Sequence, residues 1–153
     1  MHEQDKPISA PASVDFSPID DAVGYRLRRA QLAVLQDFNE AFAARGLRPA
    51  DYFVLLILSK NPGLKQSEVA EALGIQRANF VAIVDGLEQK GMAERRKSDA
   101  DRRVQSLYIT PLGRSYLDEI QPIVREHEER VIARLGGREA QDQLNALLGK
   151  LYD

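Results

Sequence analysis

The chain has 153 residues, 44% of them hydrophobic and 29% charged, which fits one folded domain with a sizeable core. It has no cysteine, which excludes disulfides and cysteine-based zinc or redox sites, and its two histidines, His2 and His127, are too few for a histidine metal site. No apolar run reaches the roughly 18 residues of a membrane-spanning helix and the N-terminus lacks a secretion-signal pattern, so we expect a cytoplasmic protein without cofactors.

Charge is unevenly distributed along the chain. The net charge is −2 overall, yet residues 76–103 carry seven basic and five acidic side chains, a local charge of +2. A mildly basic face on an acidic body is compatible with binding to nucleic acid, although this signal alone is weak.

The first half of the chain predicts a tail followed by two helices. Residues 1–17 hold prolines and small polar residues without periodicity, which indicates a disordered tail. From about Ile19, apolar residues recur at helical spacing as far as a C-cap at Gly46. A second helix begins near Pro49 and ends before the turn Asn61-Pro62-Gly63.

The middle of the chain predicts a helix-turn-helix followed by a hairpin. A short helix, about residues 66–73, is separated by Gly74 from a second helix over about residues 76–89. Gly74 can take the positive φ of a tight turn, four residues after the small Ala70. Strands over residues 92–96 and 105–109 then form a basic hairpin, which makes the arrangement a winged one. By spacing alone, an ordinary helical hairpin is the alternative.

Two helices complete the predicted fold. Thr110-Pro111 starts a long helix that Gly136-Gly137 ends, and we expect Pro122 to kink it. A last helix presents a row of leucines: Leu144, Leu147, Leu148 and Leu151. The fold class is therefore mainly α with a small β-hairpin wing, a winged helix-turn-helix with N- and C-terminal dimerisation helices. We expect a single domain over residues 18–153, with a DNA-binding lobe at 48–110 and dimerisation helices at 18–46 and 111–153.

The segment LKQSEVAEALGIQRANFVAIVDGLEQKGMAERRKSDADRRVQSLYITPLGR, Leu64–Arg114, resembles the MarR family of bacterial regulators. The resemblance is most specific in LEQKGMAERR and SDADRRVQSLYITPLG, and the helix order extends it over residues 19–152. Lys65 departs from the family, in which a threonine-like cap is common. The resemblance implies a homodimer with interlocked terminal helices, a palindromic operator and, often, release by a small molecule. It also implies that Asp101 orients Arg103 towards the minor groove; a solvated loop pair is the alternative.

Several polar residues are candidates for contact with DNA. Gln and Asn can pair with adenine, Arg can pair with guanine or phosphate, and Ala can touch a thymine methyl. Hydroxyl, amide and basic side chains at the motif's first helix and at the wing suit phosphates. For each residue alone an exposed polar side chain is the alternative, and the group is the firmer prediction. The predicted DNA-binding set is Gln66, Ser67, Gln76, Arg77, Asn79, Ala82, Arg95, Arg96, Asp101, Arg102 and Arg103.

An effector site is a further hypothesis. Arginines and aromatic residues near the start of the first helix suit an anion with an aromatic or phosphate part, and we expect an aromatic acid or an acyl-CoA thioester. The predicted set is Tyr25, Arg26, Arg29 and Tyr52, with Arg28 beside them. An exposed basic helix face explains the same residues equally well, and His127 is interpreted as a buried interface residue rather than a ligand contact.

The sequence therefore predicts a DNA-binding transcriptional regulator, a repressor that a small anionic effector releases from its operator. No nucleophile motif or usable histidine pair indicates an enzyme. The alternative function is a winged-helix module for protein–protein contacts without DNA readout. The sequence does not name the operator, the regulated genes or the effector.

Overall fold

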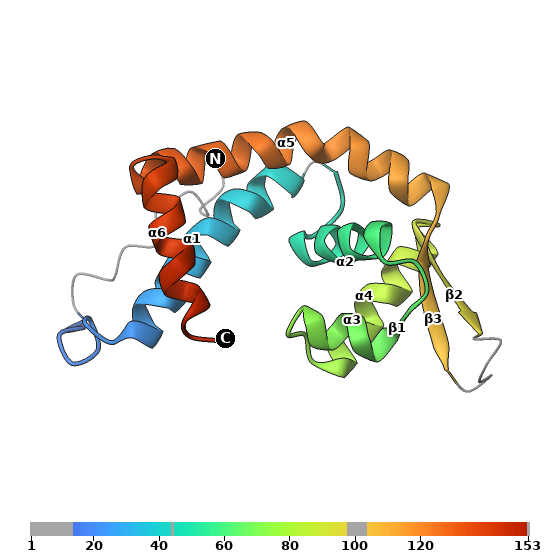
Figure 1. Cartoon of the computed structure of the whole chain (residues 1–153), viewed down its shortest axis with the longest axis horizontal. Helices are drawn as coiled ribbons and strands as arrows, with labels where there is room; N and C mark the ends of the chain where they lie inside the picture. Colours follow the sequence, from blue (N-terminus) through green and yellow to red (C-terminus); the bar gives the residue numbers. More distant parts are fainter. Residues whose placement is uncertain (1–13, 44, 98–103, 153) are drawn as a thin grey trace.

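The computed structural model describes residues 14–43, 45–97 and 104–152. They form helices and strands in the order α1 (Val23–Ala43), α2 (Pro49–Lys60), β1 (Leu64–Lys65), α3 (Gln66–Ala72), α4 (Arg77–Gln89), β2 (Ala93–Lys97), β3 (Gln105–Ile109), α5 (Pro111–Leu135) and α6 (Arg138–Gly149). Helix α5 spans the molecule; α1 and α6 lie at one end of it, and α2 to α4 with the sheet lie at the other (Figure 1). We call these halves the arm and the lobe. The predicted fold class is confirmed.

The helix-turn-helix forms as the spacing predicts. Gly74 has φ +61°, and the amide of Ile75 donates to the carbonyl of Ala70 across the turn at 2.9 Å. Val69 on α3 and Phe80 on α4 are fully buried where the two helices pack. Lys65 supplies no side-chain cap to α3, but its amide donates to the Glu68 carboxylate at 2.7 Å, which satisfies a backbone donor at the helix start.

The wing belongs to a three-stranded antiparallel sheet in the order β1-β3-β2. Strands β2 and β3 pair from Ala93 opposite Ile109 to Lys97 opposite Gln105, as the predicted hairpin requires. The two-residue strand β1 was not predicted, because two residues carry no alternating pattern. It pairs Leu64 with Leu107 and thereby fixes the start of α3 against the wing.

The start of α5 joins the lobe to the arm. Thr110 accepts a hydrogen bond from the amide of Gly113 at 3.1 Å and donates one to the carbonyl of Gly91 at 2.6 Å. The predicted cap is confirmed, and its second bond fixes α5 to the end of the recognition helix. Pro122 lies inside α5, which continues as one helix and is bowed along its length (Figure 1).

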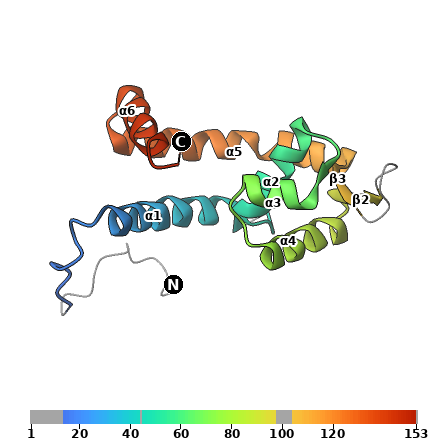
Figure 2. The same ribbon diagram turned by 60° about the horizontal axis from the view of Figure 1, so that its bottom comes forward.

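The arm leaves apolar surface uncovered in the single chain. Helix α6 has no buried residue, and apolar side chains of α1, of α6 and of the turn after α6 remain in part exposed: Val23 64%, Leu27 37%, Leu144 36%, Leu147 61% and Leu151 60%. Figure 2 shows α1 and the α6 end of α5 extending from the lobe in the same direction, and α1 packs on α5 through Asp37 and His127. Within the described part of the chain, no helix combines the length and apolar character needed to cross a membrane.

Some predicted boundaries moved. Helix α1 begins at Val23 rather than near Ile19, α4 begins at Arg77 with Gln76 as its N-cap, and β2 begins at Ala93 rather than Met92. The predicted tail reached Ser17, but Phe16 is half-buried and stacks on Tyr25 with ring centroids 6.1 Å apart. This aromatic contact places the segment beside α1, although the segment lies in a stretch of polar composition.

Replacement of Tyr116 by phenylalanine is expected to stabilise the protein by about 1 kcal/mol, because it removes a buried polar group without a partner. Among the described residues, the Tyr116 hydroxyl has no hydrogen-bond partner, and burial raises its pKa to about 12. Chemical denaturation measures the change, with the exposed Tyr152 as the matched position for a neutral Tyr→Phe control. A Tyr116→Phe variant less stable than the wild type would mean that the hydroxyl is paired.

Candidate DNA interface and effector pocket

The N-terminal end of α4 presents polar side chains to solvent. Gln76, Arg77, Asn79 and Ala82 are exposed, whereas Phe80, Ile83, Val84 and Leu87 on the other face are buried. Gln76 makes no side-chain capping bond to its own helix. The burial pattern therefore leaves the predicted base-reading residues on one free face of the recognition helix.

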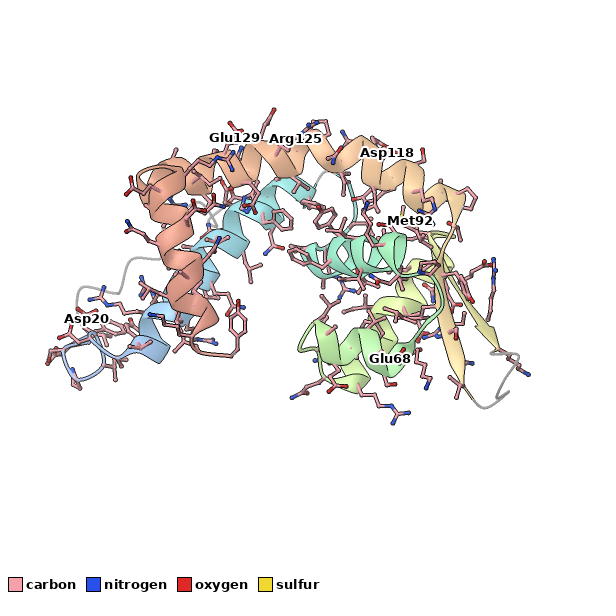
Figure 3. The ribbon with its side chains drawn as sticks, in the orientation of Figure 1. Asp20, Glu68, Met92, Asp118, Arg125 and Glu129 are labelled. Carbon is pink, nitrogen blue, oxygen red and sulfur yellow. The ribbon has the colours of Figure 1, made fainter. Side chains whose placement is uncertain are left out.

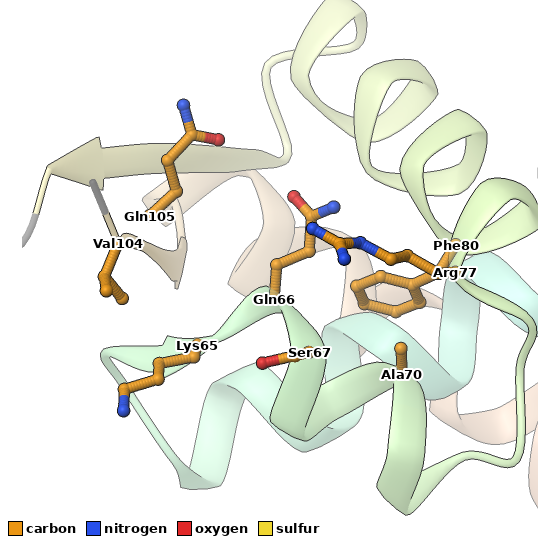
Figure 4. A pocket seen from close by; sticks show the side chains of 8 residues that line it. All are labelled: Lys65, Gln66, Ser67, Ala70, Arg77, Phe80, Val104 and Gln105. Atoms are coloured by element: carbon orange, nitrogen blue, oxygen red, sulfur yellow. The ribbon is translucent and has the colours of Figure 1, made fainter.

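A hollow of about 310 Å³ lies between α3, the start of α4 and β3. Figure 4 shows Arg77 extending over Phe80 towards Gln66, with Ser67 and Lys65 on the α3 side and Gln105 on the strand side. Gln66, Ser67 and Arg77, which were predicted separately, are thus brought together. The hollow has cationic and amide walls, which suit a phosphate group.

Arg95 lies inside the lobe rather than on its surface. Its guanidinium contacts the carboxylates of Asp85, at 2.7 Å, and Glu88, and it donates to the amide oxygen of Gln66 at 3.0 Å. The side chain is only 16% exposed. In this position Arg95 links β2 to both α3 and α4, so its charge is used to hold the motif together. The sequence analysis predicted that Arg95 contacts a phosphate, whereas in the structure its guanidinium faces Asp85, Glu88 and Gln66.

Arg96 lies on the exposed side of the same strand. Its guanidinium pairs with Glu94 and stacks on the Tyr108 ring at 4.4 Å from the centroid. The stacking holds the charge at the base of the wing, where a DNA backbone could meet it. The predicted wing residues Asp101, Arg102 and Arg103 lie outside the described residues.

The predicted effector residues fall at two places. Tyr25, Arg26 and Arg29 line a surface cavity of about 420 Å³ with Phe16, Ser17 and Asp20. Arg26 is engaged there by the Asp20 carboxylate at 3.2 Å. Figure 3 shows Asp20 at the far end of the arm and Glu68 in the lobe, so this cavity is remote from the DNA-binding helices.

Tyr52 lies elsewhere and is not brought together with these residues in one chain. It packs against Phe38, 13 residues after Tyr25 on α1, which corresponds to ~20 Å along the helix. Helical periodicity indicates which face of a helix is buried, but it cannot give the distance between Tyr25 on α1 and Tyr52 on α2.

A second cavity, of about 300 Å³, surrounds Tyr52 at the junction of arm and lobe. Its wall is mostly apolar and aromatic and comes from α1, α2 and α5: Val34, Leu35, Phe38, Tyr52, Phe53, Leu56, Val124, His127 and Glu128. Of these residues, the predicted effector set contained Tyr52. Their helical spacing is that of a core, and the exposure of Phe53, at 42%, and of Leu56, at 38%, departs from that pattern.

One wall of this cavity, which we call the junction cavity, holds a hydrogen-bonded histidine. His127 is 2% exposed, and its Nδ1 lies 2.5 Å from Oδ2 of Asp37. Arg130 donates to both oxygens of the same carboxylate, at 3.0 and 3.3 Å. Burial raises the pKa of Asp37, but the hydrogen bonds from Arg130 and His127 outweigh it and hold the pKa below its usual value. Asp37 is therefore a carboxylate at neutral pH.

A polar groove adjoins the junction cavity. It shares Tyr52 and Leu56 with the cavity and continues between α2 and α5 past the cations Lys60 and Arg114 and the carboxylate of Asp118. A molecule with an aromatic end and an anionic end could therefore extend from the cavity to the two cations.

Known proteins that are similar to this chain are transcriptional regulators. The family model described as MarR family matches residues 45–104. The chain is 36% identical over 131 residues to a proposed transcriptional regulatory protein for the hcr operon of Thauera aromatica, covering 85% of this chain and 78% of that protein. It is 33% identical over 123 residues to the transcriptional repressor MprA of Escherichia coli, covering 79% and 69%.

Solved structures extend the likeness to the whole fold. The transcriptional repressor CouR bound to a 23-mer DNA duplex superposes with a TM-score of 0.82 at 38% identity, covering 93% of this chain and all of that one. CouR bound to p-coumaroyl-CoA superposes with a TM-score of 0.81 at the same identity, covering 90% and 96%.

Proposed function

Because the chain belongs to the MarR family of transcriptional regulators, we propose that it is a homodimeric repressor that an aromatic effector releases from a palindromic operator. The observation that carries the proposal is the exposed polar face of α4, placed beside a basic wing in a fold shared with DNA-bound CouR. Enzymatic activity is no part of this function, since MarR-family proteins regulate transcription.

In the proposed complex, α4 enters the major groove. Gln76 and Asn79 are placed to pair with adenine, Arg77 with guanine or phosphate, and Ala82 to contact a thymine methyl. Ser67, Gln66 and Arg96 lie where the phosphates flanking the groove would pass. Arg95 is assigned a different role, because its carboxylate partners leave it to position α3, α4 and the wing.

Replacement of Arg103 by alanine is expected to weaken operator binding at least tenfold while the fold stays intact. The proposal assigns this residue to the minor groove, with Asp101 orienting its guanidinium. Gel-shift titration against the operator measures the loss, and Arg125→Ala, which changes an exposed arginine on the outer face of α5 (Figure 3), is the matched control. Unchanged affinity of the Arg103 variant would remove the wing from the mechanism.

The arm supplies the apolar surface for the proposed dimer. One recognition helix reads only a few base pairs, so specific binding needs two copies on two half-sites. The exposed leucines of α6 and the apolar residues at the start of α1 supply an interface that the single chain leaves uncovered.

The junction cavity is the proposed effector site. It lies between the arm helices α1 and α5 and the lobe helix α2, so its occupant can change how the lobe is held on the arm. A ligand that binds more tightly to one lobe arrangement shifts the population towards it. The aromatic walls suit a planar ring, and the groove with Lys60 and Arg114 gives the anionic remainder of an aromatic acid or acyl-CoA thioester a route outwards.

The proposal is tested by measuring DNA binding against salt and against effector candidates. Affinity for the operator should fall steeply with salt, by about 10³ between 50 and 200 mM if six phosphates are contacted. Aromatic acids and their CoA thioesters should then be titrated into the complex. A protein–protein module would instead show no operator preference, and salt-independent association with a partner protein would contradict DNA readout.

A further inference from the structure

We propose that Lys65 and Arg77 together bind one phosphate of the DNA backbone in the hollow beside α3, so that Arg77 contributes affinity but does not read a base. The inference rests on the proposed function and deepens it. It decides between guanine and phosphate as the partner of Arg77, and it adds Lys65, which was outside the predicted DNA-binding set.

Arg77 lies on the side of α4 that faces α3 and the wing. Three helical turns further along the same side is Glu88, which contacts Arg95 of β2. Figure 4 shows the Arg77 side chain extending over Phe80 towards Gln66 of α3. The guanidinium is therefore directed across the hollow.

The residues that suit base contacts lie on another side of α4. Asn79 and Ala82, two and five residues after Arg77, are turned roughly to the opposite side of the helix. The first helix of a helix-turn-helix crosses the DNA backbone while the second enters the major groove. A side chain that reaches from α4 towards α3 is thus directed to the backbone.

The hollow offers an anion two cations and several neutral donors. Its polar lining is Lys65, Gln66, Ser67, Arg77 and Gln105, and no acidic side chain among the described residues lines it. Neither Lys65 nor Arg77 forms an ion pair within the described part of the chain, whereas Arg95 and Arg96 are both paired with carboxylates. Both charges in the hollow are therefore available to a phosphate.

The arrangement of these donors fits a phosphate better than a base edge. Arginine reads guanine through two parallel bonds in one plane. Here the donors come from three elements, with Lys65 and Ser67 on the α3 side, Gln105 on the strand side and Arg77 on α4 (Figure 4). Donors that converge from different sides match the several oxygens of a phosphate.

Arg95 fixes one wall of the hollow. Its Nε donates to Oε1 of Gln66 at 3.0 Å, and because an arginine has no acceptor, the amide oxygen is the atom that it holds. The amide nitrogen of Gln66 keeps its donors and has no partner among the described residues. Arg95 thus positions a neutral donor group beside the two cations.

Lys65 is the position at which the chain departs from the threonine-like residue common in the family. It is exposed, pairs with Ser106 in the sheet and supplies no side-chain cap to α3. Lysine therefore gives up a cap and adds a charge at the hollow. A Lys65→Thr variant should be at least as stable as the wild type, because it can cap the helix, and yet bind DNA more weakly.

The test measures the affinity of the full chain for its selected operator and for a random duplex of equal length across a salt series. Arg77→Gln and Lys65→Thr should each weaken both duplexes by the same factor, roughly tenfold or more. Each should lower the salt slope of the dimer by about two, one contact per copy. Arg125→Gln, which removes the same charge from the outer face of α5 (Figure 3), should change neither quantity.

A conservative variant separates the two partners of Arg77. Arg77→Lys keeps the charge but loses the planar fork, so it should retain the salt slope and the preference for the operator. If Arg77→Lys or Arg77→Gln bound the random duplex like the wild type and the operator at least about tenfold more weakly, Arg77 would read a base and the inference would be wrong. An unchanged slope for Lys65→Thr would equally overturn the shared site. If the wild type bound neither duplex in a salt-dependent way, the proposed function itself would fail.

Discussion

Replacement of Leu147 by glutamate is expected to convert the dimer into a folded monomer and to weaken operator binding by roughly 100-fold or more, because the avidity of two half-sites is lost. Leu147 is 61% exposed in the single chain, so the substitution leaves the core of each chain untouched. In the proposed dimer the same side chain is buried in an apolar interface, where an unpaired carboxylate is strongly unfavourable.

Sedimentation measures the assembly state and gel-shift titration measures the affinity. The matched control is Leu112→Glu, which changes a leucine that is 54% exposed at the start of α5, far from the arm. This control should remain a dimer. If Leu147→Glu also remained a dimer with full affinity, α6 would have no part in the interface.

Replacement of Gly113 by alanine is expected to destabilise the protein by about 3 kcal/mol or more and to lower its melting temperature by roughly 6–12 °C. A Cβ at this position would lie 2.2 Å from the carbonyl oxygen of Met92 and 2.8 Å from a side-chain carbon of Ile109. The carbonyl oxygen of Met92 is a backbone atom, so α5 would have to move away from the lobe at this point.

Gly86→Ala in α4 is the matched control for Gly113. Nothing lies within 4 Å of a Cβ built at Gly86, and its φ is not positive. Alanine should therefore stabilise the helix there, by up to about 1 kcal/mol. Thermal unfolding of both variants separates the close contact at Gly113 from a general effect of replacing glycine. An unchanged melting temperature for Gly113→Ala would show that the approach of α5 to Met92 is loose.

Local signals in the sequence predicted most of the fold. Gly74 between two amphipathic segments, and Thr110 before Pro111, each specify a turn or a helix start within a few residues, and both form as predicted. Strand β1 and the packed Phe16 could not be predicted, because each depends on a partner distant in sequence or on one aromatic contact.

The sequence predicted the exposed residues of α4 well, but it did not predict the surroundings of Arg95 or the residues of the junction cavity. Exposed residues on one face of α4 follow from helical periodicity, whereas the surroundings of an arginine or a histidine depend on tertiary structure. Arg95 looked like a phosphate contact until its pairing with Asp85 and Glu88 was known. Most residues that line the junction cavity were not in the predicted effector set, because residues such as Phe38 and Val124 have the spacing of an ordinary core, and only packing shows the space between them.

Selection of bound sequences from a pool of random duplexes tests the central claim most directly. The account predicts enrichment of a palindrome whose half-sites lie about one helical turn apart, and loss of the bound fraction when an aromatic acyl-CoA thioester is added. A pool that stays random after repeated selection at low salt would contradict the assignment of this chain as a sequence-specific repressor.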